Sequence, residues 1–516
     1  MKSKKVISTI FVVLSLTLFS KAFGLVRNAL IASNFGTSAD ADAYQTAVRI
    51  TAQLFMTLGS AVTATAIPII IGYISKKNND KSNFFVSNAM TSLVILTSII
   101  TLVGIGLSPL LVKLFAFGFD AYRLELTTKL VQIMFPILVI IPVVYLFVSV
   151  LQSHGKFSVT SMLSIPFNFV VIGYLIFLTP KYGIQGLAVA TLIGWMAQGL
   201  VQIPFAAKKG FKYKPTFDIN DKDLRLMLRL IVPILLSSAV YNVNMLIDNA
   251  IASTLTVGRL SSLSYAFVVY TAVSSTIIYG VSTVLFPNFA EFVEKNNLEG
   301  LKSALTSIIK GMLFIVMPMI LGLLALRVEI IQIIYMRDEF TLADSLLTAG
   351  PLGYYMIGMI GFAFQDIFNR AFFALRNTKL PLMTSIISVT TNIVLNLILV
   401  QFFDLNGLAM ATSIAVILNG LMLFAALNNQ IGRFDIKSLV LSFTKVTFAA
   451  ILMYVSVKYF VSLKVLDSLI ISTGLSVLIG IVIYAVTTII LKVESAEFIL
   501  TTTGKIIKKI GGKHGN

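Results

Sequence analysis

The sequence predicts an all-α polytopic membrane protein with about fourteen transmembrane helices. Of its 516 residues, 57% are hydrophobic and only 12% are charged, and the mean hydropathy is +0.92. Soluble domains carry about 25% charged residues, so this composition excludes a soluble or disordered chain. Apolar runs of about 20 residues, enough for a helix to cross ~30 Å of hydrocarbon, recur along the chain. A membrane β-barrel would instead show short alternating segments.

The first apolar run follows Met1-Lys-Ser-Lys-Lys5 directly. Because another apolar run follows it, rather than a cleavage site and a soluble domain, we interpret it as a span and not as a signal peptide. The predicted spans lie near residues 6–33, 45–74, 86–116, 127–152, 157–179, 184–206, 225–254, 262–289, 304–327, 343–373, 380–402, 406–427, 438–462 and 466–491.

The basic residues orient these spans. Lysines and arginines precede span one, follow spans two, six and ten, and end the chain, so all of them fall on one side of the membrane. The opposite connections carry mainly carboxylates, at Asp40, Asp42, Asp120, Glu125, Asp338, Glu339 and Asp344. The positive-inside rule therefore places both termini in the cytoplasm. This distribution also accounts for the net charge of +18, so no nucleic-acid partner is expected.

Three short motifs recur at one offset of about 220 residues. Gly186-Leu-Ala-Val-Ala-Thr191 recurs as Gly407-Leu-Ala-Met-Ala-Thr412, and residues 28–33 and 61–68 recur more loosely at 248–253 and 280–287. An even number of spans in each copy keeps its orientation, which predicts two parallel repeats. We therefore expect an N-lobe at 1–222, a C-lobe at 223–430, and two further spans with a basic tail at 431–516.

Spans one and two each carry a polar stripe. An ionisable group at the centre of a membrane helix costs about 2.5–3.5 kcal/mol, so such groups face protein or water. At 100° per residue each set shares one face: Ser20, Lys21, Arg27 and Asn28 in span one, and Asp42, Arg49 and Gln53 in span two. We expect these faces to line a wet, net positive cavity. The alternative is that the arginines reach the interface or pair with Asp42.

Other intramembrane charges are scattered over the second half of the chain. Asp248 lies one helical turn from Asn244 and is a candidate site residue. Asp366 and Arg370 are spaced i, i+4 and are expected to neutralise each other. Lys445 is expected to reach towards a lipid headgroup.

The residue inventory excludes most catalytic chemistry. The chain has no cysteine and two histidines, His154 and His514, which argues against zinc and histidine acid–base sites. It contains no Walker A or dinucleotide-binding motif. Asp40-Ala-Asp42 has the DxD pattern of some glycosyltransferases, but it lies on the side opposite to nucleotide donors. We therefore expect no enzyme activity, cofactor or metal, and instead an alternating-access transporter.

Several motifs resemble the MurJ (MviN) lipid II flippases, within the multidrug/oligosaccharidyl-lipid/polysaccharide exporter superfamily. They occupy residues 20–44, 151–157 and 182–188, and the strongest is Arg370-Ala-Phe-Phe-Ala-Leu-Arg-Asn-Thr-Lys379. The resemblance implies fourteen spans, a bacterial plasma-membrane location and the transfer of lipid-linked peptidoglycan precursor to the outer leaflet. It places Arg27, Asp42 and Arg49 at charged cavity positions. Lys21 stands where the family has arginine, which removes the bidentate fork.

Three positions depart from the family pattern. Asn28 replaces an acidic residue, Phe55 replaces a basic one, and Val268 stands where a second-lobe arginine is usual. The expected function is still lipid II flipping. Lys21, Arg27 and Arg49 would attract the diphosphate, and Ser20, Asn28 and Gln53 would contact sugar or peptide. A cation gradient or the membrane potential would drive the cycle. The alternatives are a flippase for another polyprenyl-linked glycan, a drug/cation antiporter, or a membrane scaffold.

Overall fold

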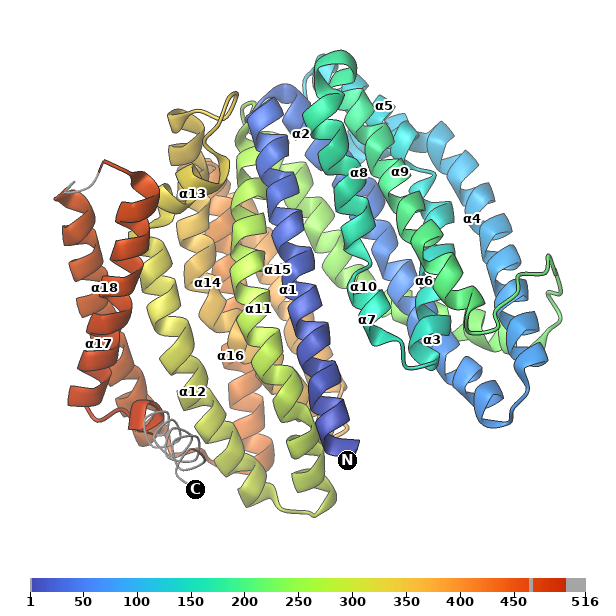
Figure 1. The fold of residues 1–516 in the computed structure, drawn as a ribbon. Helices are drawn as coiled ribbons and strands as arrows, with labels where there is room; N and C mark the ends of the chain where they lie inside the picture. Colours follow the sequence, from blue (N-terminus) through green and yellow to red (C-terminus); the bar gives the residue numbers. More distant parts are fainter. Residues whose placement is uncertain (1, 464–466, 498–516) are drawn as a thin grey trace, which may run out of the picture. The chain divides into compact units, whose positions relative to one another are not determined.

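The computed structural model describes residues 2–463 and 467–497, and these form helices without any strand (Figure 1). The helices are α1 (Lys2–Phe35), α2 (Ala39–Val48), the π-helix η1 (Arg49–Gln53), α3 (Leu54–Ser75), α4 (Asn79–Phe115), α5 (Ala121–Met134), α6 (Ile137–Ser153), α7 (Phe157–Ser161), α8 (Ser164–Phe177), α9 (Thr179–Ala207), α10 (Lys222–Ala252), α11 (Arg259–Glu294), α12 (Leu298–Ala325), α13 (Arg327–Tyr335), α14 (Leu342–Ala374), α15 (Lys379–Phe403), α16 (Leu405–Ile431), α17 (Ile436–Ser462) and α18 (Leu469–Ile490).

The all-α membrane class is confirmed. Eleven helical segments of the described chain are long and apolar enough to cross a membrane. Three of them join shorter helices: α2, η1 and α3 form one segment, as do α5 with α6 and α7 with α8. The remaining predicted spans coincide with α1, α10 and α11, and the count of fourteen stays a prediction. The basic tail expected at the end of the chain lies at 498–516, outside the described residues.

The chain divides into two compact units. Unit one contains residues 1–268 and 337–344, and unit two contains 269–336 and 345–516. The boundary between the units falls inside α11, whereas the sequence places the lobe boundary near residue 222. The lobe division by repeats therefore stays a prediction.

The recurring glycine motif occupies a similar place in each unit. In unit one α8 packs on α9, and in unit two α15 packs on α16. A Cβ on Gly186 would lie 2.2 Å from the Tyr174 hydroxyl oxygen, and one on Gly407 would lie 2.3 Å from the Leu399 carbonyl oxygen. Small residues let membrane helices approach closely, so both glycines are needed where their helix pair is tightest.

One core of unit one joins α3, α4, α6 and α10 with the segment after α9. Phe85, Phe147, Phe211 and Met227 are buried in it. Alanines on α3 and α4 let these helices approach closely. This core holds the chain of α3, and through it η1 and α2, against the rest of the unit.

Candidate functional site

The polar face of α1 packs along α8. The Ser20 and Ser164 hydroxyl oxygens are 2.6 Å apart. The Asn28 side-chain amide donates to the Gly24 carbonyl of its own helix at 2.8 Å. Ser20 and Asn28 are buried, while Lys21 and Arg27 remain partly exposed. The face therefore contains two buried hydrogen-bonding residues and two accessible cations.

Arg27 lies against the aromatic ring of Phe167. Its guanidinium carbon lies 5.0 Å from the ring centroid of Phe167, within the range of a cation–π interaction. Among the described residues no carboxylate pairs with Arg27. The geometry fixes the position of the guanidinium and leaves its charge uncompensated.

Asp42 is in a different environment from the one expected. Its side chain is completely buried, and its two oxygens accept the backbone N–H groups of Gly258 and Ser261, each at 2.8 Å. The Arg123 guanidinium lies 3.4 Å from the same carboxylate. Free N–H groups and a partial positive charge mark the start of a helix, so this carboxylate caps α11 from a distant helix. The packing favours a structural role for Asp42 over substrate contact.

The helix through Arg49 and Gln53 widens into the π-helix η1. Arg49 is buried, and its Nη2 donates to the Ser264 hydroxyl at 3.0 Å, while Gln53 is exposed. A π-helical turn inserts one extra residue, so positions after it rotate away from the face that a 100° step predicts. Arg49 and Gln53 both lie inside η1 and differ in exposure, and the expectation that they share one face stays a prediction.

The two predicted stripes contact different neighbours. Ser20 and Arg27 of α1 contact α8, whereas Asp42 and Arg49 of α2 and η1 contact the first turns of α11. A wet cavity lined jointly by both faces stays a prediction.

A group of contacts, which we call the clasp, lies at the end of unit one where Asp40 and Asp42 are found. We define it as Ser33 and Gly36 with Tyr265 and residues 337–344. The Ser33 hydroxyl donates to Asp338 at 2.5 Å, and the Glu339 N–H donates to the Ser33 carbonyl at 3.1 Å. Phe340 is buried edge-on against Tyr265, whose hydroxyl donates to the Gly36 carbonyl at 3.0 Å. Only glycine fits at position 36, because φ is +52° and a Cβ would lie 2.6 Å from the Glu339 carbonyl oxygen.

The remaining predicted charges have local partners. Asp248, on α10, is partly buried and accepts from the Asn244 amide at 3.5 Å. The Arg370–Asp366 pair is confirmed, with Nε 3.1 Å from the carboxylate. The Lys445 ammonium donates to the Lys492 carbonyl at 3.3 Å, and its reach towards a lipid headgroup stays a prediction.

Sequence reasoning missed Arg123 and the start of α11. Arg123 bridges Asp42 and Asp120, with Nε 2.6 Å from the latter. Asp120 also accepts the Arg123 backbone N–H, and that bond and the guanidinium hold the pKa of Asp120 below its usual value. The sequence did offer one indication of Arg123, because it is an arginine on the predominantly acidic side of the membrane. Nothing in the sequence pointed to Gly258, Ser261 or Ser264, because their role depends on contacts across more than 200 residues.

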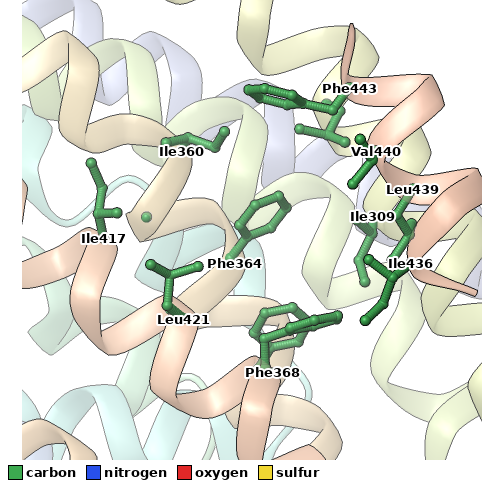
Figure 2. A pocket seen from close by; sticks show the side chains of 14 residues that line it. Ile309, Ile360, Phe364, Phe368, Ile417, Leu421, Ile436, Leu439, Val440 and Phe443 are labelled. Carbon is green, nitrogen blue, oxygen red and sulfur yellow. The ribbon is translucent and has the colours of Figure 1, made fainter. Parts of the chain in front are cut away.

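Unit two contains an apolar groove between α12, α14, α16 and α17. It encloses about 320 Å³ and is partly open. In Figure 2, Phe364 and Phe368 of α14 lie in the centre, with Leu421 of α16 on the left and Leu439 and Phe443 of α17 on the right and at the top. Its lining is almost wholly hydrocarbon, so a chain without polar atoms fits it better than a sugar or an ion.

Comparison with known proteins identifies the family. The family model for lipid II flippase MurJ matches residues 31–493. The chain belongs to the MurJ family. A probable lipid II flippase MurJ of Haemophilus influenzae is 30% identical over 465 residues, which cover 86% of this chain and 91% of that protein. Its counterpart in Vibrio cholerae is 29% identical over 440 residues, covering 83% and 84%.

Solved structures agree with the MurJ assignment. A lipid II flippase MurJ in an inward closed conformation superposes with a TM-score of 0.80 at 26% identity, covering 92% of this chain and 98% of that one. An inward-facing multidrug resistance MATE family transporter reaches a TM-score of 0.69 at 16% identity, covering 83% and 98%. The second match shows a shared fold only.

The burial of Asp42 leads to a stability prediction. Replacing Asp42 by alanine leaves the Arg123 charge and two helix-capping N–H groups without their acceptor. Removing one partner of a buried ion pair costs about 3–5 kcal/mol. We expect Asp42→Ala to lower the melting temperature and the membrane level strongly. Asp40→Ala, which removes a partly exposed acceptor of Tyr122, should cost less than about 1 kcal/mol. A fully stable Asp42→Ala protein without transport would contradict this structural role.

Proposed function

We infer that this MurJ family protein moves lipid II from the inner to the outer leaflet of the bacterial plasma membrane by alternating access. The match over residues 31–493 and the MurJ structural neighbour support this function. The substrate is a polyprenyl-diphosphate-linked glycan, and both termini lie in the cytoplasm.

The uncompensated charge of Arg27 is the observation that carries the proposal. A charged side chain in a membrane helix costs free energy unless a ligand or water compensates its charge. Lys21 lies six residues earlier on α1, roughly 9 Å along the helix axis, and is also partly accessible. Two cations at this spacing suit an extended anion such as a diphosphate, through charge-assisted hydrogen bonds. Arg49 completes the positive set, while its bond to Ser264 fixes its direction.

The apolar groove of unit two suits the prenyl chain. Burial of hydrocarbon in a preformed apolar groove is favourable at about 25 cal/mol per Å² of apolar surface removed from water. In the membrane, lipid already surrounds the tail, so the groove adds little free energy of burial. Its contribution is to hold the tail in one position and direction. The groove then keeps the tail on one path while the headgroup crosses.

The clasp is the element that must open for the headgroup to leave on the acidic side. Residues 337–344 belong to unit one, although the chain on either side of them belongs to unit two. Release of the clasp breaks the Ser33–Asp338 bond and withdraws Phe340 from Tyr265. A coupling cation or the membrane potential drives this step, since one charge moved through 100 mV supplies about 2.3 kcal/mol.

A second lipid-linked glycan is the alternative substrate. Val268 leaves the second lobe without its usual arginine, and Phe55 packs on Phe135 with ring centroids 5.3 Å apart instead of adding a charge. A flippase for capsule or teichoic-type units would rescue no cell that lacks only lipid II transport. A drug/cation antiporter needs an acidic site, which the cations of α1 oppose.

Genetic rescue tests the proposed substrate and the role of Arg27. In a bacterium depleted of its own lipid II flippase, we expect wild type and Arg229→Ala to restore growth. Arg229 is an exposed arginine on α10 and serves as the matched control. Arg27→Ala should fail at normal membrane levels, and Arg27→Lys should rescue in part because it keeps the charge. Full rescue by Arg27→Ala would remove Arg27 from the site, and failure of well-expressed wild type would favour another glycan.

Cross-linking tests the opening of the clasp. The chain contains no cysteine, so a Ser33→Cys/Asp338→Cys protein carries only the intended pair. We expect a short thiol cross-linker to stop transport in this variant and a reductant to restore it. Glu125→Cys/Lys129→Cys places the same reagent across one exposed helical turn of α5 and should leave transport unchanged. Continued transport with the Ser33–Asp338 positions fully cross-linked would show that the clasp does not open.

A further inference from the structure

The basic connection between α9 and α10 is an ordered strap. Residues 208–221 contain no helix or strand, and they run along the first turns of α4, as their hydrogen bonds show. The Asn83 amide donates to the Gly210 carbonyl at 3.0 Å, and the Lys214 N–H donates to the Ser87 hydroxyl at 3.2 Å. Asn88 pairs with the backbone of Asp218 through two bonds, of 2.7 and 2.8 Å. Backbone bonds of this kind fix the strap's course independently of its own side chains.

The strap's side chains divide into those that contact the helices and those that are exposed. Phe211 is buried and packs edge-on against Phe147, with ring centroids 5.9 Å apart. Tyr213, the next residue but one, lies with its hydroxyl 3.0 Å from that of Thr91 on α4. Lys212 and Lys214 stand on either side of Tyr213 in the sequence. Both are exposed, as are Lys208 and Lys209.

The exposed surface of α4 places the strap at a definite depth. Apart from Phe84 near the start of the helix, the exposed large apolar side chains of α4 run from Ile95 to Leu114. At 1.5 Å per residue this stretch measures about 30 Å, the thickness of the hydrocarbon core. Thr91 is then roughly 6 Å outside the hydrocarbon and Ser87 roughly 12 Å outside it. The strap therefore lies at the depth of the lipid phosphates.

The exposed apolar residues of α9 and α10, the helices on either side of the strap, indicate the same depth. Exposed apolar residues of α9 end at Phe205, before the strap begins, and those of α10 start at Leu226, after it ends. The strap itself exposes Tyr213, Phe217 and Ile219 by 47%, 58% and 59%. Aromatic and apolar side chains beside lysines are typical of a surface that contacts the membrane interface rather than water alone.

The lysines are available to an anionic partner. Within the described part of the chain, none of Lys208, Lys209, Lys212 and Lys214 takes part in an ion pair. The strap's carboxylates have other roles, since Asp218 accepts the Asn220 N–H and Asp221 caps α10 by accepting the Leu224 N–H. We propose that residues 208–219 bind the headgroups of anionic phospholipids, phosphatidylglycerol in particular. This surface is separate from the substrate site and does not depend on which glycan is carried.

Lipid titration of the full-length protein tests the strap. Phosphatidylglycerol is added to the purified protein in a neutral detergent, and bound lipid is counted by native mass spectrometry. Each lysine near an anionic surface contributes about fivefold in affinity. We expect Lys212→Gln/Lys214→Gln to weaken binding at least tenfold and Lys212→Arg/Lys214→Arg to retain it. The matched control is Lys295→Gln/Lys302→Gln, which removes two lysines near the junction of α11 and α12 that pair with Glu291 and Glu299.

The possible results separate a site from general charge. A tenfold loss confined to the strap variant, with phosphatidylcholine binding unchanged, supports the proposal. Equal losses in the strap and control variants would show that net charge alone attracts the lipid. Unchanged affinity in the strap variant, at an unchanged melting temperature, would place the lipid elsewhere. Either of these two results would overturn the proposal.

Discussion

The charges buried among the helices must be compensated where water is absent, and this constraint governs the arrangement of unit one. Asp42 satisfies it completely, because two backbone N–H groups and the Arg123 guanidinium surround its carboxylate. The start of α11 therefore depends on a residue that lies more than 200 positions earlier in the chain. Arg27 satisfies the constraint only in part, through the Phe167 ring.

This difference separates structure from function among similar residues. A fully compensated charge has no remaining capacity for a ligand, so Asp42 maintains the fold at the acidic end of the bundle. A positioned but uncompensated cation gains most when an anion arrives, because binding removes an existing electrostatic penalty. The clasp of Ser33, Gly36, Tyr265 and residues 337–344 is held by few contacts, most of them polar, which is why we propose it as the element that opens. Its hydrogen bonds and a single buried ring are weaker than a continuous apolar interface.

The sequence predicted the helices well because the membrane imposes their length and composition. The Asp366–Arg370 pair was also predictable, since i, i+4 spacing brings two side chains together in any helix. The different exposure of Arg49 and Gln53 was not, because the π-helical turn η1 that contains both leaves no mark on the hydrophobic pattern. The partners of Asp42, Ser33 and Arg49 were equally hidden, because contacts over such distances arise only when the helices pack. The sequence therefore predicted individual candidate residues, while the structure was needed to show which of them lie together.

Direct binding of lipid II to the purified full-length protein tests the central claim, that the uncompensated charge of Arg27 holds the substrate diphosphate. Affinity is measured for wild type, Arg27→Gln and Arg229→Gln in one neutral detergent, with the melting temperature of each recorded. Removing a charge-assisted hydrogen bond costs about 1.5–3 kcal/mol, so Arg27→Gln should bind lipid II roughly ten- to a hundredfold more weakly. Arg229→Gln should match wild type. Equal affinity in all three proteins at equal stability would contradict the account.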